Sequence, residues 1–139
     1  MLLSQHLELR KRIHELREVA ASVQMSQDEV LEQRAAMLAG TIGRFGSELR
    51  AHLASEEELL GPVLEHIDPW GRLRLELMRV EHAHQRAVLD ALRTDRNMGA
   101  REMAKRASSL SMDVLADMEA EERDLFTELR DDAAVPGQT

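Results

Sequence analysis

The chain has no cysteine and no tyrosine, and only one tryptophan and two phenylalanines among its 139 residues. Without cysteine there is neither a disulfide framework nor a thiolate for metal binding or nucleophilic chemistry, which favours a reducing compartment. The apolar residues are mainly leucine, alanine, valine, isoleucine and eight methionines. Because the residues that suit strands are scarce, this composition favours helices.

Long apolar runs and an excess of positive charge are also missing. The first residues, MLLSQHLELRKRI, bring charged side chains before a signal-peptide core can form, and no later run approaches the roughly 20 residues of a membrane span. We therefore expect a cytoplasmic protein with no membrane partner. The net charge is −8, with acidic residues spread along the chain, so we expect no nucleic-acid partner.

Breaking residues divide the chain into helical segments. Ser26 and Glu29 have the spacing of a capping box, which predicts that a second helix starts there after a first helix over about 2–23. The pair Asp68-Pro69, an N-cap residue followed by proline, predicts the start of a third helix.

A polar stretch at 95–99 separates the third helix from a fourth, which is expected to run to about Arg130. The last residues, DDAAVPGQT, have the composition of a frayed tail. A chain of this length is the size of one domain with its own core. We therefore expect a single domain over 1–130 and a flexible C-terminal tail over 131–139.

Apolar residues recur three and four positions apart in each segment, the spacing that lines one helix face against its neighbours. Four such helices with short connections predict an all-α, antiparallel up-down four-helix bundle. The apolar positions of this predicted seam are Leu2, Leu9, Ile13, Leu16, Ala20, Val23, Leu31, Ala35, Leu38, Ile42, Phe45, Leu49, Leu59, Val63, Leu75, Met78, Leu89, Leu92, Met103, Ala107, Leu110 and Val114, and the seam then continues into the edge Asp124-Leu125-Phe126.

Seven polar side chains interrupt this seam. They are His6, His52, Glu56, His82, Gln85, Asp117 and Glu121. An ionised carboxylate or an unpaired imidazole in an apolar interior is costly unless something offsets the burial. A bound cation would do so, because it takes up the carboxylate charge and the imidazole lone pairs together.

The two halves of the chain also carry related sequences. SQHLELRKRIHELR at 4–17 aligns without gaps on VEHAHQRAVLDALR at 80–93, and LRAHLASEEELL at 49–60 aligns on VLADMEAEERDL at 114–125. Two helical hairpins of one design, packed about a pseudo-two-fold axis, would bring six ligands to one central cavity. The matched pairs are His6 with His82, Arg10 with Arg86, His52 with Asp117, and Glu56-Glu57 with Glu121-Glu122.

At these residues the sequence resembles the hemerythrin-like family, the HHE cation-binding domains, up to about Arg130. The resemblance is carried by His6, the run HLASEEELLGP, Glu81-His82 and the run DMEAEERDLF. It implies a bundle around a non-haem di-iron centre, with terminal histidine ligands and two bridging carboxylates. By position, His6, His52 and His82 are then the terminal ligands. Glu56 and Glu121 are the bridges.

Two positions depart from the family pattern. The family's oxygen carriers have a second histidine one turn after the ligand on the third helix, where this chain has Arg86, which only donates hydrogen bonds and cannot bind a metal. Most relatives begin the pair on the fourth helix with histidine, where this chain has Asp117. A shorter anionic ligand would lower the potential of the centre. A reversible oxygen carrier is therefore disfavoured against a centre with open positions.

The predicted metal ligands are His6, His52, Glu56, His82, Asp117 and Glu121, with Glu81, Gln85 and Arg86 as candidates for contacts to the ligands. The expected cofactor is two irons per chain, oxo- or hydroxo-bridged, ahead of manganese or zinc. The expected small ligand is dioxygen, peroxide or nitric oxide. Enzyme status stays open, with catalase-like or ferroxidase-like activity as the reactions in view, and the protein partner is unknown.

Other interpretations stay open. The bundle could be a metal-free regulatory or interaction module, or hold a mononuclear or zinc site. Glu57, Glu58 and Glu122 are expected to face solvent, as are His14 and His84. Pro62 is expected to disrupt the second helix. Three glycines at 40, 43 and 46 indicate either the close approach of a neighbouring helix or a local break.

Overall fold

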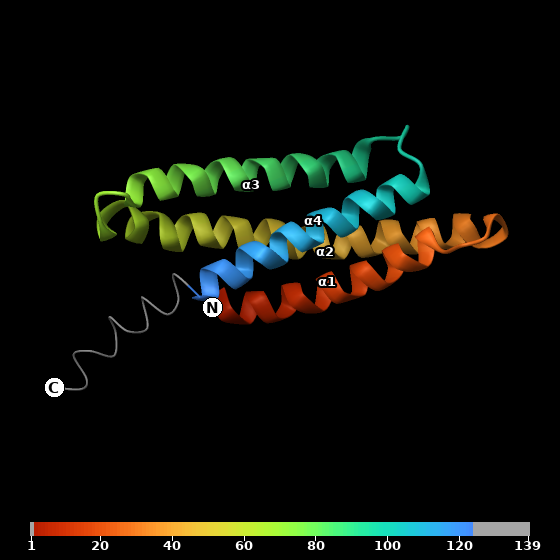
Figure 1. Cartoon of the computed structure of the whole chain (residues 1–139), viewed down its shortest axis with the longest axis horizontal. Helices are drawn as coiled ribbons and strands as arrows, with labels where there is room; N and C mark the ends of the chain where they lie inside the picture. The colour runs from red at the N-terminus through yellow and green to blue at the C-terminus, as the bar shows by residue number, and fades with distance from the viewer. Residues whose placement is uncertain (1, 124–139) are drawn as a thin grey trace.

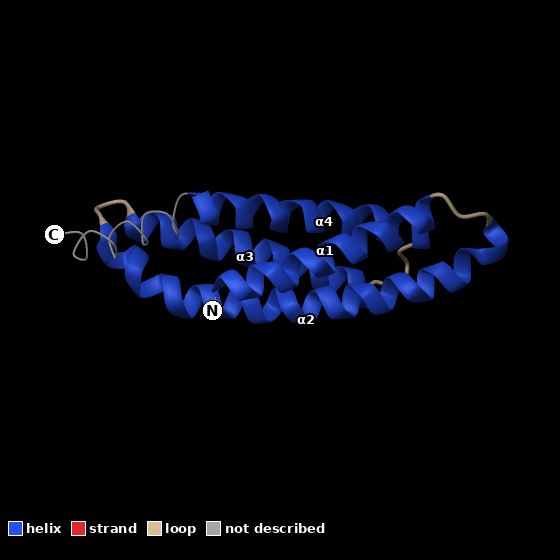
Figure 2. Cartoon of the chain, turned by 90° about the horizontal axis from the view of Figure 1, so that it is seen from below, coloured by secondary structure: helices blue, strands red, loops and turns tan. Residues whose placement is uncertain are grey.

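The structure, a computed structural model, describes residues 2–123 and contains four helices. They are α1 (Leu2–Gln24), α2 (Asp28–Ile67), α3 (Gly71–Thr94) and α4 (Ala100–Glu121). Successive helices run in opposite directions side by side (Figure 1), and the loops lie at the two ends of the molecule (Figure 2). The predicted all-α, antiparallel four-helix bundle is confirmed.

Three of the sequence predictions fall on residues that the structure does not describe. The expected end of the fourth helix near Arg130, the edge at 124–126 and the tail over 131–139 all lie outside residues 2–123. Within that range, no helix is long and apolar enough to cross a membrane.

Two apolar clusters fill the bundle, and a polar layer separates them. Along α2 the larger cluster reaches Leu53, the smaller one begins at Leu60, and Glu56 lies between them. The same order is found along α3 on either side of His82. The polar layer therefore crosses the bundle between two dry regions, where an uncompensated charge is costly.

The predicted apolar seam is buried or partly buried throughout the described residues, with one exception in the C-terminal part of α2. There Leu60 and Leu64 are buried, whereas Leu59 is exposed and Val63 is only partly buried. This end of α2 extends past most of α1, which contributes only Leu2 to the smaller cluster. The buried face of α2 therefore turns toward α3 instead of following the seam shared by all helices.

The capping box predicted at the start of the second helix is wrong. The N-cap position is Gln27, and no side chain bonds to the cap. The Ser26 hydroxyl instead donates to the carbonyl of Ser22 at 2.6 Å and accepts from Arg34 at 3.1 Å. Ser26 thus closes the end of α1 rather than opening α2, because the last carbonyls of a helix also need donors.

The turn between α2 and α3 contradicts the sequence prediction at two places. Helix α3 begins at Gly71 with Trp70 at its N-cap and no side-chain bond to the cap, so Asp68 is not the N-cap and Pro69 is not the first helical residue. The Asp68 carboxylate accepts from the backbone N–H of Trp70 at 2.8 Å, which stabilises the turn that precedes α3. Helix α2 also continues through Pro62 to its end. Proline removes the hydrogen bond to the carbonyl of Glu58, one turn earlier. Glu58 is exposed, so water can satisfy that carbonyl.

None of the glycines at 40, 43 and 46 marks a break, since α2 is continuous past all of them, and Gly46 marks the close approach of a neighbouring helix. A Cβ at Gly46 would lie 3.0 Å from the side chain of Leu89 on α3. A Cβ added at Gly43 would have no atom within 4 Å. The tightest position is Gly71 at the start of α3, where an added Cβ would lie 1.5 Å from the carbonyl oxygen of Leu64.

Replacing Gly71 with alanine should therefore destabilise the fold by about 2 kcal/mol or more, because backbone atoms of the α2–α3 turn must move. Gly43→Ala is the matched control and should stabilise the fold by up to about 1 kcal/mol, since alanine is the better helix former and has room there. Urea unfolding of the metal-free protein measures both. Equal stabilities for Gly71→Ala and the parent chain would contradict the close contact.

Candidate metal centre

Four side chains from three helices converge in the polar layer. His6 comes from α1, His52 and Glu56 from α2, and Glu121 from α4. One ligand atom from each lies within 4.8 Å of the others. His6, His52 and Glu56 are at most 2% exposed, and Glu121 is partly buried. These nitrogen and oxygen donors are close enough together to surround one cation.

His82 adjoins this group from α3. Its Nε2 lies 3.3 Å from Oε2 of Glu56, while Oε1 of Glu56 forms an ion pair with Nε2 of His52. Glu56 therefore lies between two histidines on different helices. Across the site, Nε2 of His6 is 3.5 Å from Oε2 of Glu121. Each of the three histidines thus turns Nε2 toward a carboxylate at the centre.

The outward nitrogens of two histidines are held by carboxylates. Nδ1 of His6 is 3.0 Å from Oε1 of Glu122, and Arg10 binds both oxygens of that carboxylate at 2.6 and 2.8 Å. Contacts of this kind orient histidine ligands in metal sites, because an N–H at Nδ1 leaves the lone pair at Nε2.

The other half of the bundle repeats the arrangement. Nδ1 of His82 is 3.0 Å from Glu57, which Arg86 binds at 2.8 and 3.2 Å. The arginine lowers the pKa of the Glu57 carboxyl, and burial opposes this effect only in part. Arg10 likewise lowers the pKa of Glu122, to about 2. Both carboxyl groups therefore remain ionised acceptors at neutral pH.

These contacts correct the expectation that Glu57 and Glu122 face solvent, whereas Glu58 does so as expected. The internal repeat contained the signal, since it pairs Arg10 with Arg86 as well as the two glutamates. Each group of one histidine, one arginine and one glutamate joins the hairpin α1–α2 to the hairpin α3–α4. The histidine and the arginine come from one hairpin, and the glutamate comes from the other. Sequence alignment alone could not show that crossed pairing.

His52 has a neutral partner that the sequence did not single out. Its Nδ1 lies 3.1 Å from Oε1 of Gln5, whose amide nitrogen donates to the Ser55 hydroxyl at 3.0 Å. In the repeat, Gln5 corresponds to Glu81 and His52 to Asp117. One half of the site therefore has an amide and an imidazole where the other half has two acids.

Asp117 lies outside the compact group of four donors and is partly buried. It accepts a hydrogen bond from Gln85, so Gln85 contacts a predicted ligand as proposed from the sequence. Burial raises the pKa of Asp117, repulsion from Glu81 raises it further, and the bond from Gln85 opposes both. Glu81 itself is exposed. The structure thus brings four predicted ligands together, places His82 against them and leaves Asp117 to one side.

Several inward-facing atoms of the site have no hydrogen bond. Among the described residues, these include Nε2 of His52, Oε2 of Glu56 and Oε2 of Glu121, all of them buried. Burial works to raise the pKa of Glu56, but its ion pairs with His52 and His82 outweigh burial and lower that pKa to about 2. Buried lone pairs aimed at one point without donors are the arrangement that a cation satisfies, so these residues fit a metal.

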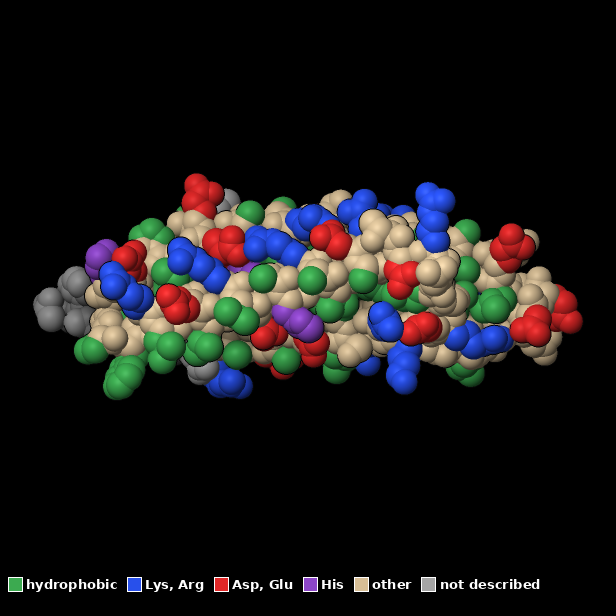
Figure 3. All heavy atoms as spheres, turned by 90° about the horizontal axis from the view of Figure 1, so that it is seen from above, with side chains coloured by type: hydrophobic (Ala, Val, Ile, Leu, Met, Phe, Trp, Pro, Cys, Tyr) green, Lys and Arg blue, Asp and Glu red, His purple; other side chains and the backbone are tan. Residues whose placement is uncertain are grey.

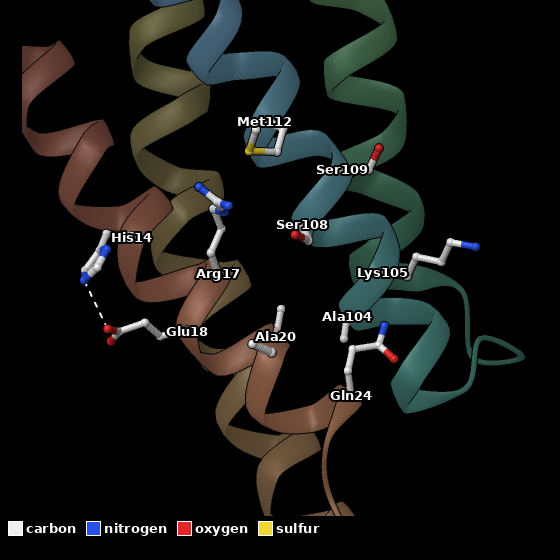
Figure 4. Close-up of a pocket in the computed structure, with 11 residues that line it drawn as sticks. His14, Arg17, Glu18, Ala20, Gln24, Ala104, Lys105, Ser108, Ser109 and Met112 are labelled. Atoms are coloured by element: carbon white, nitrogen blue, oxygen red, sulfur yellow. Dashed lines mark ion pairs between the residues drawn. The ribbon is translucent and has the colours of Figure 1, made fainter.

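A pocket of about 460 Å³ leads to the His82 side of the site. Its apolar lining comes from Leu64, Leu77, Met78 and Ala120, and its polar lining includes His82, Asp117 and Glu121. A larger pocket of about 640 Å³ lies between α1 and α4 (Figure 4) and shares no residue with the cluster. Of these two pockets, the smaller one reaches the site and offers a small molecule a route to it.

The three remaining histidines lie on the surface. His14 lines the larger pocket and pairs with Glu18 at 3.1 Å, and His84 is also exposed, both as expected. His66, near the end of α2, is exposed too. These positions take no part in the cluster.

The bundle and its buried histidine–carboxylate cluster define a helical cation-binding protein. The family model described as the hemerythrin HHE cation binding domain matches residues 1–136. No curated protein and no solved structure gives a significant match to the chain. The chain belongs to the hemerythrin HHE cation-binding family, as the sequence resemblance predicted.

Metal binding should release protons from this site. Burial raises the pKa of Glu121 to about 7, and repulsion from Glu56 adds to the rise while His6 opposes it. A cation must then displace a proton at acidic and neutral pH, so the apparent affinity should rise about tenfold per pH unit up to about pH 7. Calorimetric titrations in buffers of different ionisation enthalpy measure the protons released. A pH-independent affinity between pH 5 and 7 would contradict this result.

The same shift affects the stability of the metal-free protein. The pKa of Glu121 is higher in the folded chain than in the unfolded one, where it is 4.5. The folded state therefore binds more protons between these values, and the contribution of Glu121 to stability is lost as the pH rises through about 7. Because the bound metal replaces that proton, the stability gained on loading should grow over the same interval.

Proposed function

We propose that this protein holds two irons in the polar layer and binds, senses or reacts with a small oxidant, namely dioxygen, peroxide or nitric oxide. The observation that supports this most directly is that buried ligand atoms of His52, Glu56 and Glu121 lie close together and have no hydrogen-bond partner. Imidazole and carboxylate without thiolate form a ligand set that suits iron or manganese.

The two metal positions would differ in their ligands. His6, His52, Glu56 and Glu121 would hold the first. His82 would bind the second metal, and Glu56 and Glu121 would be shared between the two metals. Asp117 would also bind the second metal once its hydrogen bond with Gln85 is broken. An iron pair supplies redox electrons and coordination positions for a small ligand. The second position lies beside the pocket, so it is the one proposed to receive the oxidant.

The remaining residues control access and proton position. The apolar clusters on both sides of the layer exclude water, which strengthens electrostatic interactions within it. Glu122 and Glu57 hold protons on Nδ1 of His6 and His82 and so keep Nε2 available. The pocket suits a diatomic or peroxide ligand reaching His82. Peroxide disproportionation and iron oxidation are the two activities to assay.

Metal analysis of the purified protein together with its visible spectrum tests the proposal. We expect about two irons per chain and the near-ultraviolet absorption of a bridged ferric pair, with changes on addition of peroxide or nitric oxide. A colourless, iron-free preparation that ferrous iron cannot reconstitute under anaerobic conditions would contradict the proposal.

A mononuclear site is the second candidate, because the compact group of four donors includes neither His82 nor Asp117. The two candidates differ in how they depend on His82. In a two-iron site, His82→Ala should lower the metal content from two toward one per chain. In a mononuclear site the content should stay at one. His84→Ala, which alters an exposed histidine of the same helix, is the matched control.

A further inference from the structure

The outer face of α3 carries a second apolar stripe, on the side opposite the core. Trp70, just before the helix, is 67% exposed, Leu73 is 52%, Leu77 is 60% and Val80 is 68% exposed. His84 and Ala87 continue the stripe and are also exposed. We call these six residues the outer stripe. Their spacing alternates between three and four, which is the pattern of a helix that packs against another helix.

The surface view agrees with this placement. Figure 3 looks onto α3 and shows hydrophobic side chains gathered toward the end of the molecule that carries the α2–α3 turn. The core side of the same helix is already occupied by Leu75, His82 and Leu89. Among residues 2–123, nothing covers the outer side of α3, and contiguous exposed apolar surface of this kind marks interaction sites.

We propose that the outer stripe pairs with the same stripe of a second copy of this chain, with the two α3 helices antiparallel. A two-fold axis passing between Leu77 and Val80 places Leu77 against the partner's Val80. The same axis places Trp70 against the partner's Ala87, so the largest residue of the stripe meets the smallest. Alternating large and small residues across facing positions is what lets helices interdigitate.

The charges beside the stripe favour the antiparallel direction. Arg74 and Glu81 lie on the same flank, so an antiparallel pair brings Arg74 next to the partner's Glu81 and repeats this contact by symmetry. Both residues, together with Leu77, also line the pocket that leads to His82, so the second copy would lie beside the mouth of that pocket. Arg74 is 41% exposed and binds Asp68 through only one of its nitrogens. A parallel pair would instead bring Glu76 next to the partner's Glu81, which is repulsive, and would stack the two tryptophans.

Sedimentation velocity over a concentration series tests the pairing, and Trp70 supplies an internal reporter because it is the chain's single tryptophan. We expect dimers to form at on the order of 10–100 µM chain, as suits a small interface, together with a blue shift of the tryptophan emission. Val80→Glu should weaken association at least tenfold. Met37→Glu, at a 60% exposed position on α2, should leave it unchanged.

A charge exchange tests the direction of the helices. Glu81→Arg should weaken the dimer, and adding Arg74→Glu should restore it, since the pair is then present with its signs reversed. Failure of this rescue would overturn the antiparallel arrangement. A chain that stays monomeric at several hundred micromolar, or a dimer indifferent to Val80→Glu, would overturn the proposal. In a monomer, a buried type of tryptophan emission would assign the stripe to another segment of the same chain.

Discussion

Replacing His52 and Glu56 together with leucine should abolish metal binding and raise the stability of the metal-free protein by about 1–4 kcal/mol. Both positions are buried within the leucine-rich face of α2, between Leu49 and Leu60. Replacing a buried ionic pair by apolar residues of similar size is often stabilising, because the cost of desolvating both charges is removed. Both members of the pair are removed because either one left alone would be an unpaired buried group. His82, the other partner of Glu56, keeps the Glu57 carboxylate at its Nδ1.

Thermal unfolding with and without iron separates the two effects. At a free metal concentration one hundred times Kd, the free energy of unfolding of the parent chain should rise by about 3 kcal/mol. That of the double variant should not change with metal. His14→Leu with Glu18→Leu, an exposed pair at the same spacing on α1, is the matched control and should leave metal binding intact. A strongly destabilised metal-free variant would mean that the polar pair supports the fold by itself. A parent chain without any metal response would favour the metal-free module.

The sequence predicted the architecture because it depends on patterns that hold within each helix. Alternating spacings of three and four define a buried face wherever neighbours lie on both sides. The prediction failed at Leu59 and Leu60, where α2 extends past α1 and the buried face depends on which helices remain nearby. It failed at Ser26 for a related reason, because the hydroxyl could serve either of two helix ends.

The site was predictable to the extent that its residues break the apolar pattern. His52 and Glu56 stand out because they occupy slots where leucine is expected. Glu57 and Glu122 do not stand out, because a glutamate beside the seam is predicted to face solvent unless the arginine that binds it is known. Gln5 was missed for the same reason. Which flanking residues turn inward depends on the crossed packing of the hairpins, and local spacing does not encode it.

Glu122→Gln and Glu57→Gln should each weaken metal binding by about 10- to 100-fold, the usual effect of removing a group that orients a histidine ligand. Glutamine keeps the size and an acceptor oxygen but removes the charge that the arginine and the histidine Nδ1–H share. Glu58→Gln is the matched control, because Glu58 neighbours Glu57 and faces solvent.

The two variants should also differ from each other, and this difference tests the two-position arrangement. Glu122 acts through His6, which belongs to the compact group of four donors, whereas Glu57 acts through His82 beside the pocket. Under limiting iron, Glu57→Gln should therefore keep one metal and lose the second, while Glu122→Gln should weaken the position that fills first. Titration of iron into the metal-free protein resolves these stoichiometries. If Glu57→Gln kept the binding curve of the parent chain, His82 would serve no metal position, as the one-metal site requires.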